Sequence, residues 1–160
     1  MVTIERVKEL FEYNPATGLF TRLIKVKRHN KGDVAGCLKK DGYVVIKIDG
    51  VIYYAHRLAY FYMTGRWFDG ETDHKDLNRS NNKWDNIRES TYSQNQMNTG
   101  LWKTTTSGHK GVHWDKSSKK WRVRMGVNNK VLNFGSYESF EEACVVRKNK
   151  EIEFFGEFSR

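Results

Sequence analysis

The sequence has few cysteines, no long apolar run and a deficit of acidic side chains. Its two cysteines, Cys37 and Cys144, lie far apart and lack cysteine or histidine neighbours at zinc-ligand spacing. This spacing argues against a disulfide framework and against a structural zinc site. No apolar run approaches membrane-spanning length, and residues 1–13 lack the uninterrupted apolar core of a signal peptide. We therefore expect a soluble intracellular protein with no membrane partner.

The charge balance is strongly basic. Lys and Arg total 28 against 19 acids, which gives a formal net charge of +9. Such a surplus favours a polyanionic partner, with nucleic acid ahead of an anionic membrane surface. The 160 residues suffice for one ordinary domain or two small ones.

Hydrophobic spacing and turn residues predict the elements of the first half. They are a helix over residues 2–13 with Thr3 as N-cap, a strand over 19–23, strands over 42–48 and 51–54 joined by an Asp49-Gly50 turn, and a helix over 55–64 ended by Gly65. Residues 25–32 form a basic loop. This loop is either a solvated connection or a phosphate contact, and the sequence leaves both readings open.

One polar cluster in the chain has the chemistry of phosphodiester hydrolysis. Asp73 and His74 are consecutive, and Asn86 and Asn95 follow them. Asp73 is an oxygen ligand suited to Mg²⁺, and Asn95 offers a second oxygen. His74 titrates near neutral pH and suits the role of a base that deprotonates water, while Asn86 suits hydrogen bonds across the intervening loop. The pattern places Asp73-His74 on a strand, a second strand at 86–89 and Asn95 on a helix over 92–98.

The sequence pattern of the second half predicts a small three-stranded antiparallel sheet packed on one helix. Residues 99–108 have linker composition. The expected strands are 111–114, 121–125 and 131–134, with turns at Ser117-Ser118 and Asn128-Asn129. A capping box at residues 139–142 opens a helix that runs to about Phe155 and ends at Gly156.

Strand alternation gives this sheet a basic open face. Arg122 and Arg124 point to one side of their strand, while the apolar residues between and beside them point toward the helix. Arginines on an open face can reach guanine edges or phosphates in a groove. The lysines at the hairpin tip, Lys116, Lys119 and Lys120, suit contacts with the DNA backbone. A generic basic module with solvated charges is the alternative.

Residues 42–98 resemble the HNH endonuclease family, in its phage and intron-encoded branch. The resemblance is carried by Tyr54–Ala59, Thr72–Asn82, Asp85–Arg88 and Ser93–Asn95. It implies a ββα-metal fold with its core at about residues 70–98, His74 as general base and Asn86 as the residue that holds the loop. It also implies that Asp73 and Asn95 ligate one Mg²⁺ or Mn²⁺ ion per active site. Asn95 stands where many HNH enzymes have a third histidine, which argues against a Zn²⁺ preference.

Residues 108–155 resemble the AP-two DNA-binding domain of the ethylene-response-factor type. The matching segments are Gly111–His113, Lys120–Arg124, Phe134–Tyr137 and Ser139–Ala143. The resemblance implies that the sheet lies in the major groove, with His113, Arg122, Arg124 and Asn133 on its groove-facing side. His113 and Asn133 replace residues that plant members often have as Arg and Trp, so plant base specificity does not transfer.

Together these features predict an α+β protein of two domains: an HNH nuclease over 1–98, a linker over 99–108 and an AP-two-like domain over 109–160. The expected activity is metal-dependent, site-specific cleavage of double-stranded DNA by a phage-encoded enzyme of the homing type, in the cytoplasm of a bacterial host. No stable protein partner is evident. The alternatives are a catalytically inactive DNA-binding regulator and an RNA-directed nuclease. His56 is expected to have a structural or hydrogen-bonding role. Arg57 and Arg88 either touch phosphate, lie on a solvated helix face or form salt bridges.

Overall fold

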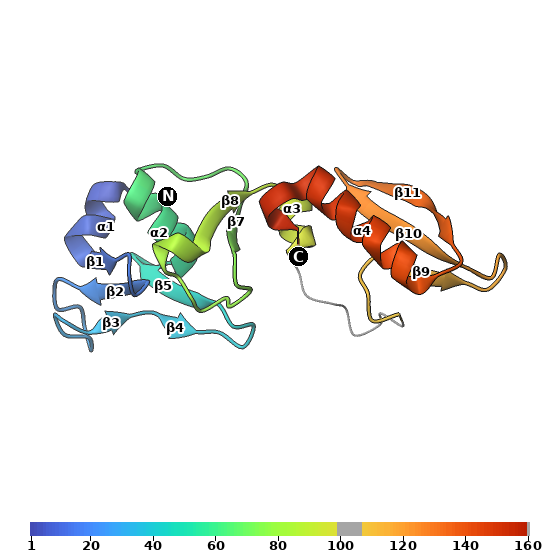
Figure 1. The fold of residues 1–160 in the computed structure, drawn as a ribbon. Helices are drawn as coiled ribbons and strands as arrows, with labels where there is room; N and C mark the ends of the chain where they lie inside the picture. Colours follow the sequence, from blue (N-terminus) through green and yellow to red (C-terminus); the bar gives the residue numbers. More distant parts are fainter. Residues whose placement is uncertain (99–106, 160) are drawn as a thin grey trace. The chain divides into compact units, whose positions relative to one another are not determined.

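The computed structural model describes residues 1–98 and 107–159, which form two compact units, Met1–Glu89 and Ser90–Arg160 (Figure 1). Each unit mixes short helices with small antiparallel sheets. The predicted linker at 99–108 lies almost entirely outside the described residues, and the predicted domain limits stay predictions. Within the described part of the chain, no helix is both long and apolar enough to cross a lipid bilayer.

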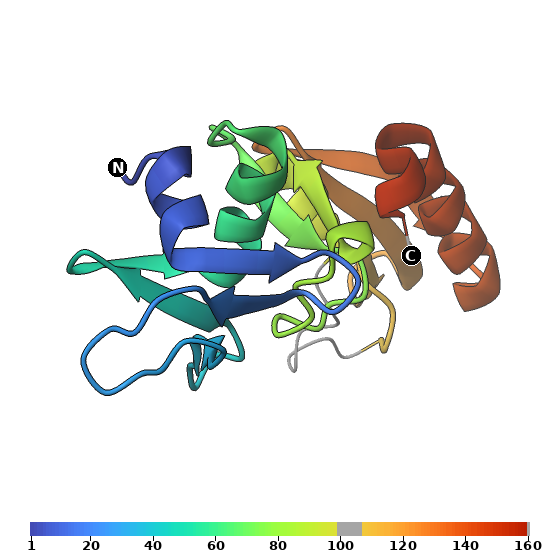
Figure 2. The same ribbon diagram turned by 90° about the vertical axis from the view of Figure 1, so that its left-hand side faces the viewer.

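The first unit contains two helices and three small sheets. Its sheets have the strand orders β1-β2-β3, β4-β5-β6 and β7-β8. Helix α2 contacts α1 and also packs against β5, β6 and β7 (Figures 1 and 2). In chain order the elements are α1 (Ile4–Leu10), β1 (Phe11–Asn14), β2 (Leu19–Arg22), β3 (Val34–Ala35), β4 (Cys37–Leu38), β5 (Val44–Ile48), β6 (Val51–Tyr54), α2 (Ala55–Thr64), β7 (Glu71–His74), the 3-10 turn η1 (Trp84–Asn86) and β8 (Ile87–Ser90).

The predicted helix over residues 2–13 is wrong at its C-terminal end. The N-cap is confirmed, because the Thr3 hydroxyl accepts a hydrogen bond from the Arg6 amide. The helix stops at Leu10, however, and the next residues form β1. Phe11 and Tyr13 are buried on either side of an exposed residue, a period of two that suits their antiparallel pairing with β2. Apolar residues at positions 11 and 13 fit both a helical and a strand period. The pairing with β2 makes this segment a strand.

Two turns of the first unit confirm the sequence prediction. Asp49 and Gly50 join β5 to β6 with φ angles of 46° and 89°, both in the left-handed region that a two-residue hairpin turn requires. Gly65 ends α2 in the same region, with φ 73°. The apolar core of this unit collects side chains from both helices and from β1, β2 and β5, among them Val7, Phe11, Phe20, Ile46 and Leu58.

The loop between β7 and β8 is anchored to the N-terminal hairpin. A Cβ atom on Gly18 would lie 2.4 Å from the Lys83 nitrogen, so only glycine permits this close approach of two backbones. The Tyr13 hydroxyl donates to the Asn82 carbonyl at 2.7 Å, and the Trp84 amide donates to the Pro15 carbonyl at 3.0 Å. The hairpin thereby fixes the path of a loop that carries several polar residues of interest.

The second unit confirms the predicted three-stranded sheet with one long helix. The sheet order is β11-β10-β9, all antiparallel, and α4 packs against it. Asn128 and Asn129 form the β10–β11 turn with φ angles of 49° and 63°, and the Ser139 hydroxyl caps α4 by accepting from the Glu142 amide. The elements are α3 (Tyr92–Met97), β9 (Val112–Asp115), β10 (Lys120–Val127), β11 (Lys130–Tyr137), α4 (Phe140–Phe155) and the 3-10 turn η2 (Gly156–Phe158).

A bulge interrupts the pairing of β10 with β11. Arg122 pairs with Ser136, whereas Arg124 pairs with Asn133, so β11 contains one residue more than β10 over this stretch. Gly135 has a φ of 112° within it. Helix α3 also belongs to this unit, because Met97 lies in a core cluster with Met125, Phe155 and Phe158.

Candidate active site and nucleic-acid interface

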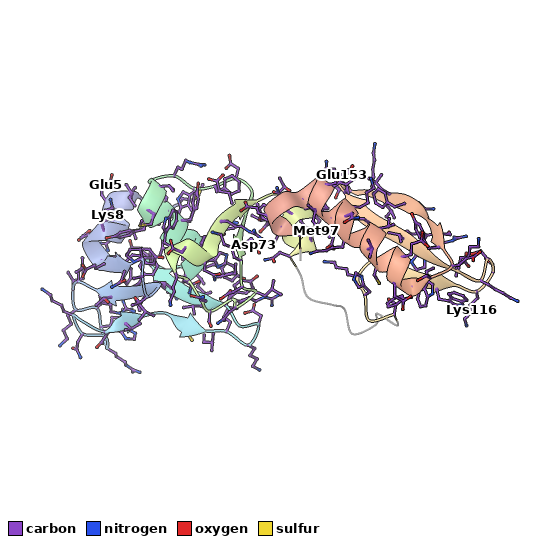
Figure 3. The ribbon with its side chains drawn as sticks, in the orientation of Figure 1. Glu5, Lys8, Asp73, Met97, Lys116 and Glu153 are labelled. Carbon is purple, nitrogen blue, oxygen red and sulfur yellow. The ribbon has the colours of Figure 1, made fainter. Side chains whose placement is uncertain are left out.

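The Asp73-His74 pair lies on β7, as predicted, and both residues are buried, at 5% and 4% exposure. Figure 3 labels Asp73 within the first unit. Consecutive strand residues point to opposite faces, so the two side chains meet different surroundings.

Asp73 is paired with Arg88 of β8. The Asp73 Oδ2 atom accepts from Arg88 Nε at 3.1 Å and from Arg88 Nη2 at 3.0 Å. Both side chains are largely buried, with 6% and 11% exposure. The sequence left Arg88 open between phosphate and a salt bridge, and the structure shows the salt bridge. A buried ion pair of this kind orients its carboxylate firmly, because separating the two charges is costly.

The predicted metal ligands come from both units. Asp73 belongs to the first unit, and Asn95 is a half-buried residue of α3 in the second. No group of three or more His, Cys, Asp or Glu side chains among the described residues suits a metal ion. A carboxylate oxygen and an amide oxygen are each ligand types that suit a hard divalent ion which keeps several waters. The ligand pairing stays a prediction.

His74 is held by a hydrogen bond that fixes its tautomer. Its Nε2 atom lies 3.2 Å from Asn82 Oδ1, and Asn82 Nδ2 donates to the Ser80 carbonyl at 3.1 Å, which sets the orientation of the amide. An amide oxygen only accepts, so Nε2 carries the hydrogen and Nδ1 of the neutral ring carries the lone pair. Burial lowers the pKa of His74, although the Asn82 contact and the charge of Asp73 act in the opposite direction.

His56 packs against this imidazole at the start of α2. The His56 and His74 ring centroids are 4.7 Å apart at an edge-to-face angle of 65°, and Tyr43 lies 5.3 Å from the His56 ring. Burial, followed by the charges of His74 and Arg57, lowers the pKa of His56 to about 3, so this ring is neutral. Arg57 donates to the Phe68 carbonyl at 2.9 Å, a structural contact where the sequence had left phosphate binding open.

Asn86 ties together the loop between β7 and β8. Its Nδ2 atom donates to Asp76 Oδ1 at 2.9 Å and to the Asn81 carbonyl at 2.8 Å. Its Oδ1 atom accepts from the Asp76 amide at 3.1 Å, and its carbonyl accepts from the Lys75 amide at 2.9 Å. These are loop-holding bonds of the kind expected for Asn86, and its part in catalysis stays a prediction.

Sequence reasoning missed two contributors to the site. Asn82 positions His74, but in the sequence it is one of several loop asparagines that suit ordinary turns. Arg79 lies 4.9 Å above the Tyr43 ring and donates to the Asp41 carbonyl at 3.0 Å. These contacts join the site loop to the β4–β5 turn, a proximity that no local pattern in the sequence signals.

The open face of the second unit's sheet collects the four predicted groove-facing residues. His113 pairs with Arg122 and Arg124 pairs with Asn133, and the alternation of β10 puts both pairs on the same face. Burial, and then the charges of Arg124 and Arg122, lower the pKa of His113. The buried Val123 and Met125 point the other way, toward the helix, as expected.

The two arginines of this face differ in their partners. Arg122 Nη2 lies 2.6 Å from Asp115 Oδ2. Hydrogen bonds from the Ser118 and Ser117 hydroxyls, with the charge of Arg122 in addition, lower the pKa of Asp115 to about 2. Arg124 is exposed. The hairpin-tip lysines Lys116, Lys119 and Lys120 lie at the β9–β10 turn, where Figure 3 labels Lys116. The Lys120 ammonium lies 3.4 Å from the Glu138 carboxylate.

Comparisons with known proteins point to a nuclease. Residues 53–97 match the family model described as HNH endonuclease. Over 88 residues the chain is 33% identical to Protein 3.8 of Escherichia phage T7, a match that covers 55% of this chain and 72% of that protein. No solved structure gives a significant match. The family match contains the strand and loop residues Asp73, His74 and Asn86 as well as Asn95 of α3.

Proposed function

We propose that this chain is a metal-dependent DNA endonuclease of the phage homing type. It belongs to the same family as Protein 3.8 of Escherichia phage T7, and its residues 53–97 match the HNH endonuclease family model. The observation that carries the proposal is the buried His74 on β7, next to Asp73, with its Nε2 hydrogen committed to Asn82. A fixed, neutral imidazole within an HNH match is suited to accept a proton from water.

The proposed roles follow from the contacts of each residue. His74 takes the proton of the attacking water at Nδ1, because Nε2 is the donor to Asn82. Asp73 and Asn95 would hold one Mg²⁺ or Mn²⁺ ion, and such an ion would stabilise the charge on the phosphate and on the leaving oxygen. Arg88 orients the Asp73 carboxylate, and Asn86 keeps the loop closed.

The second unit would supply affinity and part of the specificity, in the manner of the AP-two-like domain suggested by its sequence. Arg124, His113 and Asn133 share the open face of the sheet, and Arg124 is exposed there. An arginine on such a face can read a guanine edge or bind a phosphate. Two binding surfaces on one chain raise the effective concentration of each for double-stranded DNA.

The test is to incubate the full chain with a phage genome and Mg²⁺ or Mn²⁺ and to sequence the ends that appear. We expect ends at one or a few positions, none with excess chelator and none with His74→Ala protein. Ends scattered evenly would contradict site specificity. Tight DNA binding without cleavage under either metal would assign the chain to the regulator class, and cleavage of RNA alone would make it a ribonuclease.

A further inference from the structure

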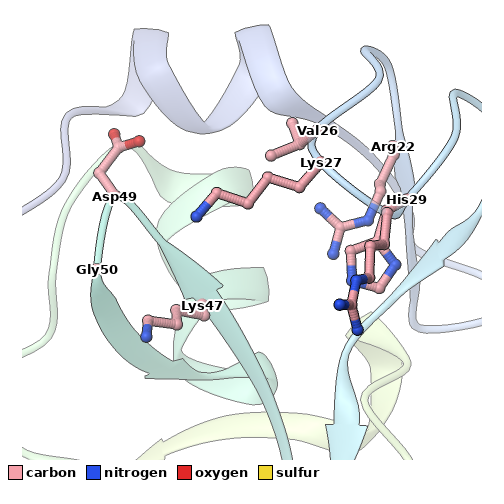
Figure 4. A pocket seen from close by; sticks show the side chains of 8 residues that line it. Arg22, Val26, Lys27, His29, Lys47, Asp49 and Gly50 are labelled. Carbon is pink, nitrogen blue, oxygen red and sulfur yellow. The ribbon is translucent and has the colours of Figure 1, made fainter.

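A basic pocket lies in the first unit between the turn at residues 26–29 and the β5–β6 hairpin (Figure 4). Its volume is about 550 Å³, within the range of ligand sites in proteins. Four lysine and arginine side chains line it, Arg22, Lys27, Arg28 and Lys47, together with His29. None of these residues belongs to the candidate active site.

The cations stand on an ordered backbone. Val26 and His29 exchange two main-chain hydrogen bonds of 3.0 Å each, which closes the turn, and Lys27 occupies it with a φ of 52°. Arg22 is fixed by the next part of the loop, since its amide donates to the Asp33 carbonyl and its carbonyl accepts from the Gly32 amide, both at 2.9 Å. The fourth cation, Lys47, projects from β5. The side chains of Lys27, Arg28 and Lys47 are exposed, but a fixed backbone lowers the entropic cost of bringing them to one anion.

The positive charge of this pocket is not balanced from within the described residues. No ion pair formed among them includes Arg22, Lys27, Arg28 or Lys47. The one lining acid, Asp49, accepts two hydrogen bonds of 2.9 Å from Arg6, and Figure 4 shows its carboxylate pointing away from Lys47. The Nε atom of Arg22 is buried and lacks a hydrogen-bond partner among the described residues. An uncompensated cluster of cations suits an anionic ligand.

The lining also indicates which part of a nucleic acid would bind. It offers four cationic side chains but no Phe, Tyr or Trp ring on which a base could stack. Lys and Arg without stacking partners are typical of contacts with phosphate. We infer that this pocket binds backbone phosphates of nucleic acid, as an anchor additional to the cleavage site and to the sheet of the second unit. The basic loop that the sequence left undecided is thus assigned to phosphate contact.

The experiment compares two double variants of the full chain with equal loss of charge. The pocket variant is Lys27→Asn with Lys47→Gln, because Asn tolerates the left-handed backbone at residue 27. The control is Lys25→Gln with Lys31→Gln, two exposed lysines of the same loop that do not line the pocket. Affinity for a random-sequence DNA duplex is measured across a salt series, and circular dichroism and thermal melting confirm that both variants are folded.

We expect the slope of log affinity against log salt to become shallower by about 1.8 in the pocket variant, if each lysine neutralises one phosphate, since each contact contributes about 0.9. The control should keep the wild-type slope. Equal changes in both variants would reduce the pocket to diffuse loop charge and overturn the inference. An unchanged slope in the pocket variant would also overturn the inference. This holds even if inorganic pyrophosphate, titrated by NMR, binds the pocket, because the pocket would then bind a small anion and not the DNA duplex. Cleavage is not measured, so the result is independent of the proposed catalysis.

Discussion

The candidate active site and the open face of the second unit's sheet differ in how far their charged side chains are buried. In the first unit, Asp73 and Arg88 are buried against each other, and His74 is buried against Asn82. In the second unit, Arg124 is exposed, and the Arg122–Asp115 pair is partly open to solvent at 34% and 15% exposure. Burial fixes orientation, which proton transfer needs, whereas exposure keeps charge accessible, which DNA binding needs. The comparison predicts that substitutions in the two regions affect different measurements.

The largest expected effect is that of His74→Ala on cleavage. Loss of a general base typically lowers the rate by about 10²–10⁴. DNA affinity should stay close to wild type, because the base acts on water. The matched control is His113→Ala on the open sheet face, which should leave the cleavage rate at saturating DNA unchanged. Single-turnover nicking and a binding assay check both, and wild-type cleavage by His74→Ala protein would refute the assignment.

Next in size is the cost of removing one partner from the buried ion pair. Asp73→Ala leaves the Arg88 charge buried and should lower the free energy of unfolding by roughly 3–5 kcal/mol. Arg122→Ala breaks a partly exposed pair and should cost at most about 1 kcal/mol. Urea denaturation measures both. Similar losses for the two variants would remove the contrast between the regions.

Asn95→Ala separates metal binding from this structural loss. It removes the proposed second oxygen ligand without touching the Asp73–Arg88 pair, so it should raise the Mg²⁺ concentration needed for half-maximal cleavage and leave the unfolding of the first unit unchanged. A metal titration of nicking provides the measurement. An unchanged metal requirement would exclude Asn95 as a ligand.

Asn86→Ala should cost less than the loss of Asp73. It removes hydrogen bonds to Asp76 and Asn81 in a partly buried setting, and we expect a destabilisation of about 1–3 kcal/mol together with reduced cleavage. Asn78→Ala is the control, since its bonds to Ser80 lie in an exposed part of the same loop. Thermal unfolding of the two variants should differ clearly, and equal melting temperatures would show that Asn86 does not hold the loop.

Single cations of the second unit should affect DNA binding and leave the stability and the cleavage chemistry close to wild type. Arg124→Ala should weaken binding to a cognate duplex by about 1–3 kcal/mol if this residue reads a base. Lys119→Ala should weaken binding to all sequences alike and make the salt dependence shallower by about one unit. Binding titrations on cognate and random duplexes distinguish them. Equal losses on both duplexes for Arg124→Ala would make the sheet a nonspecific clamp.

Local signals in the sequence predicted much of this structure. The Asp49-Gly50 hairpin, the Thr3 and Ser139 caps and the turn at Asn128 all depend on a few neighbouring residues. Strand alternation likewise placed Arg122 and Arg124 on one face. The predicted helix failed beyond Leu10 because the pairing of β1 with β2 depends on a strand farther along the chain.

The contacts within the candidate site could not be predicted in the same way. The loop between β7 and β8 folds back and is anchored on Gly18 and Tyr13. This path brings Arg88 to Asp73 and Asn82 to His74. That path depends on tertiary packing, which spacing alone does not specify. The sequence therefore identified the residue types of the site but missed that Arg88 and Asn82 orient Asp73 and His74 respectively.

The bulge at Gly135 determines which side chains of β11 lie on the face of the sheet proposed to bind DNA. The extra residue in β11 is the reason that Asn133 lies opposite Arg124 on the open face, while Phe134 packs on Phe154 of α4. If the same sequence kept the Arg122–Ser136 pair but formed no bulge, Gly135 would lie opposite Val123 and every residue of β11 before it would exchange faces, which would expose Phe134 and bury Asn133. The backbone conformation at this one glycine therefore determines which side chains of β11 lie on the open face, even with every amino acid unchanged.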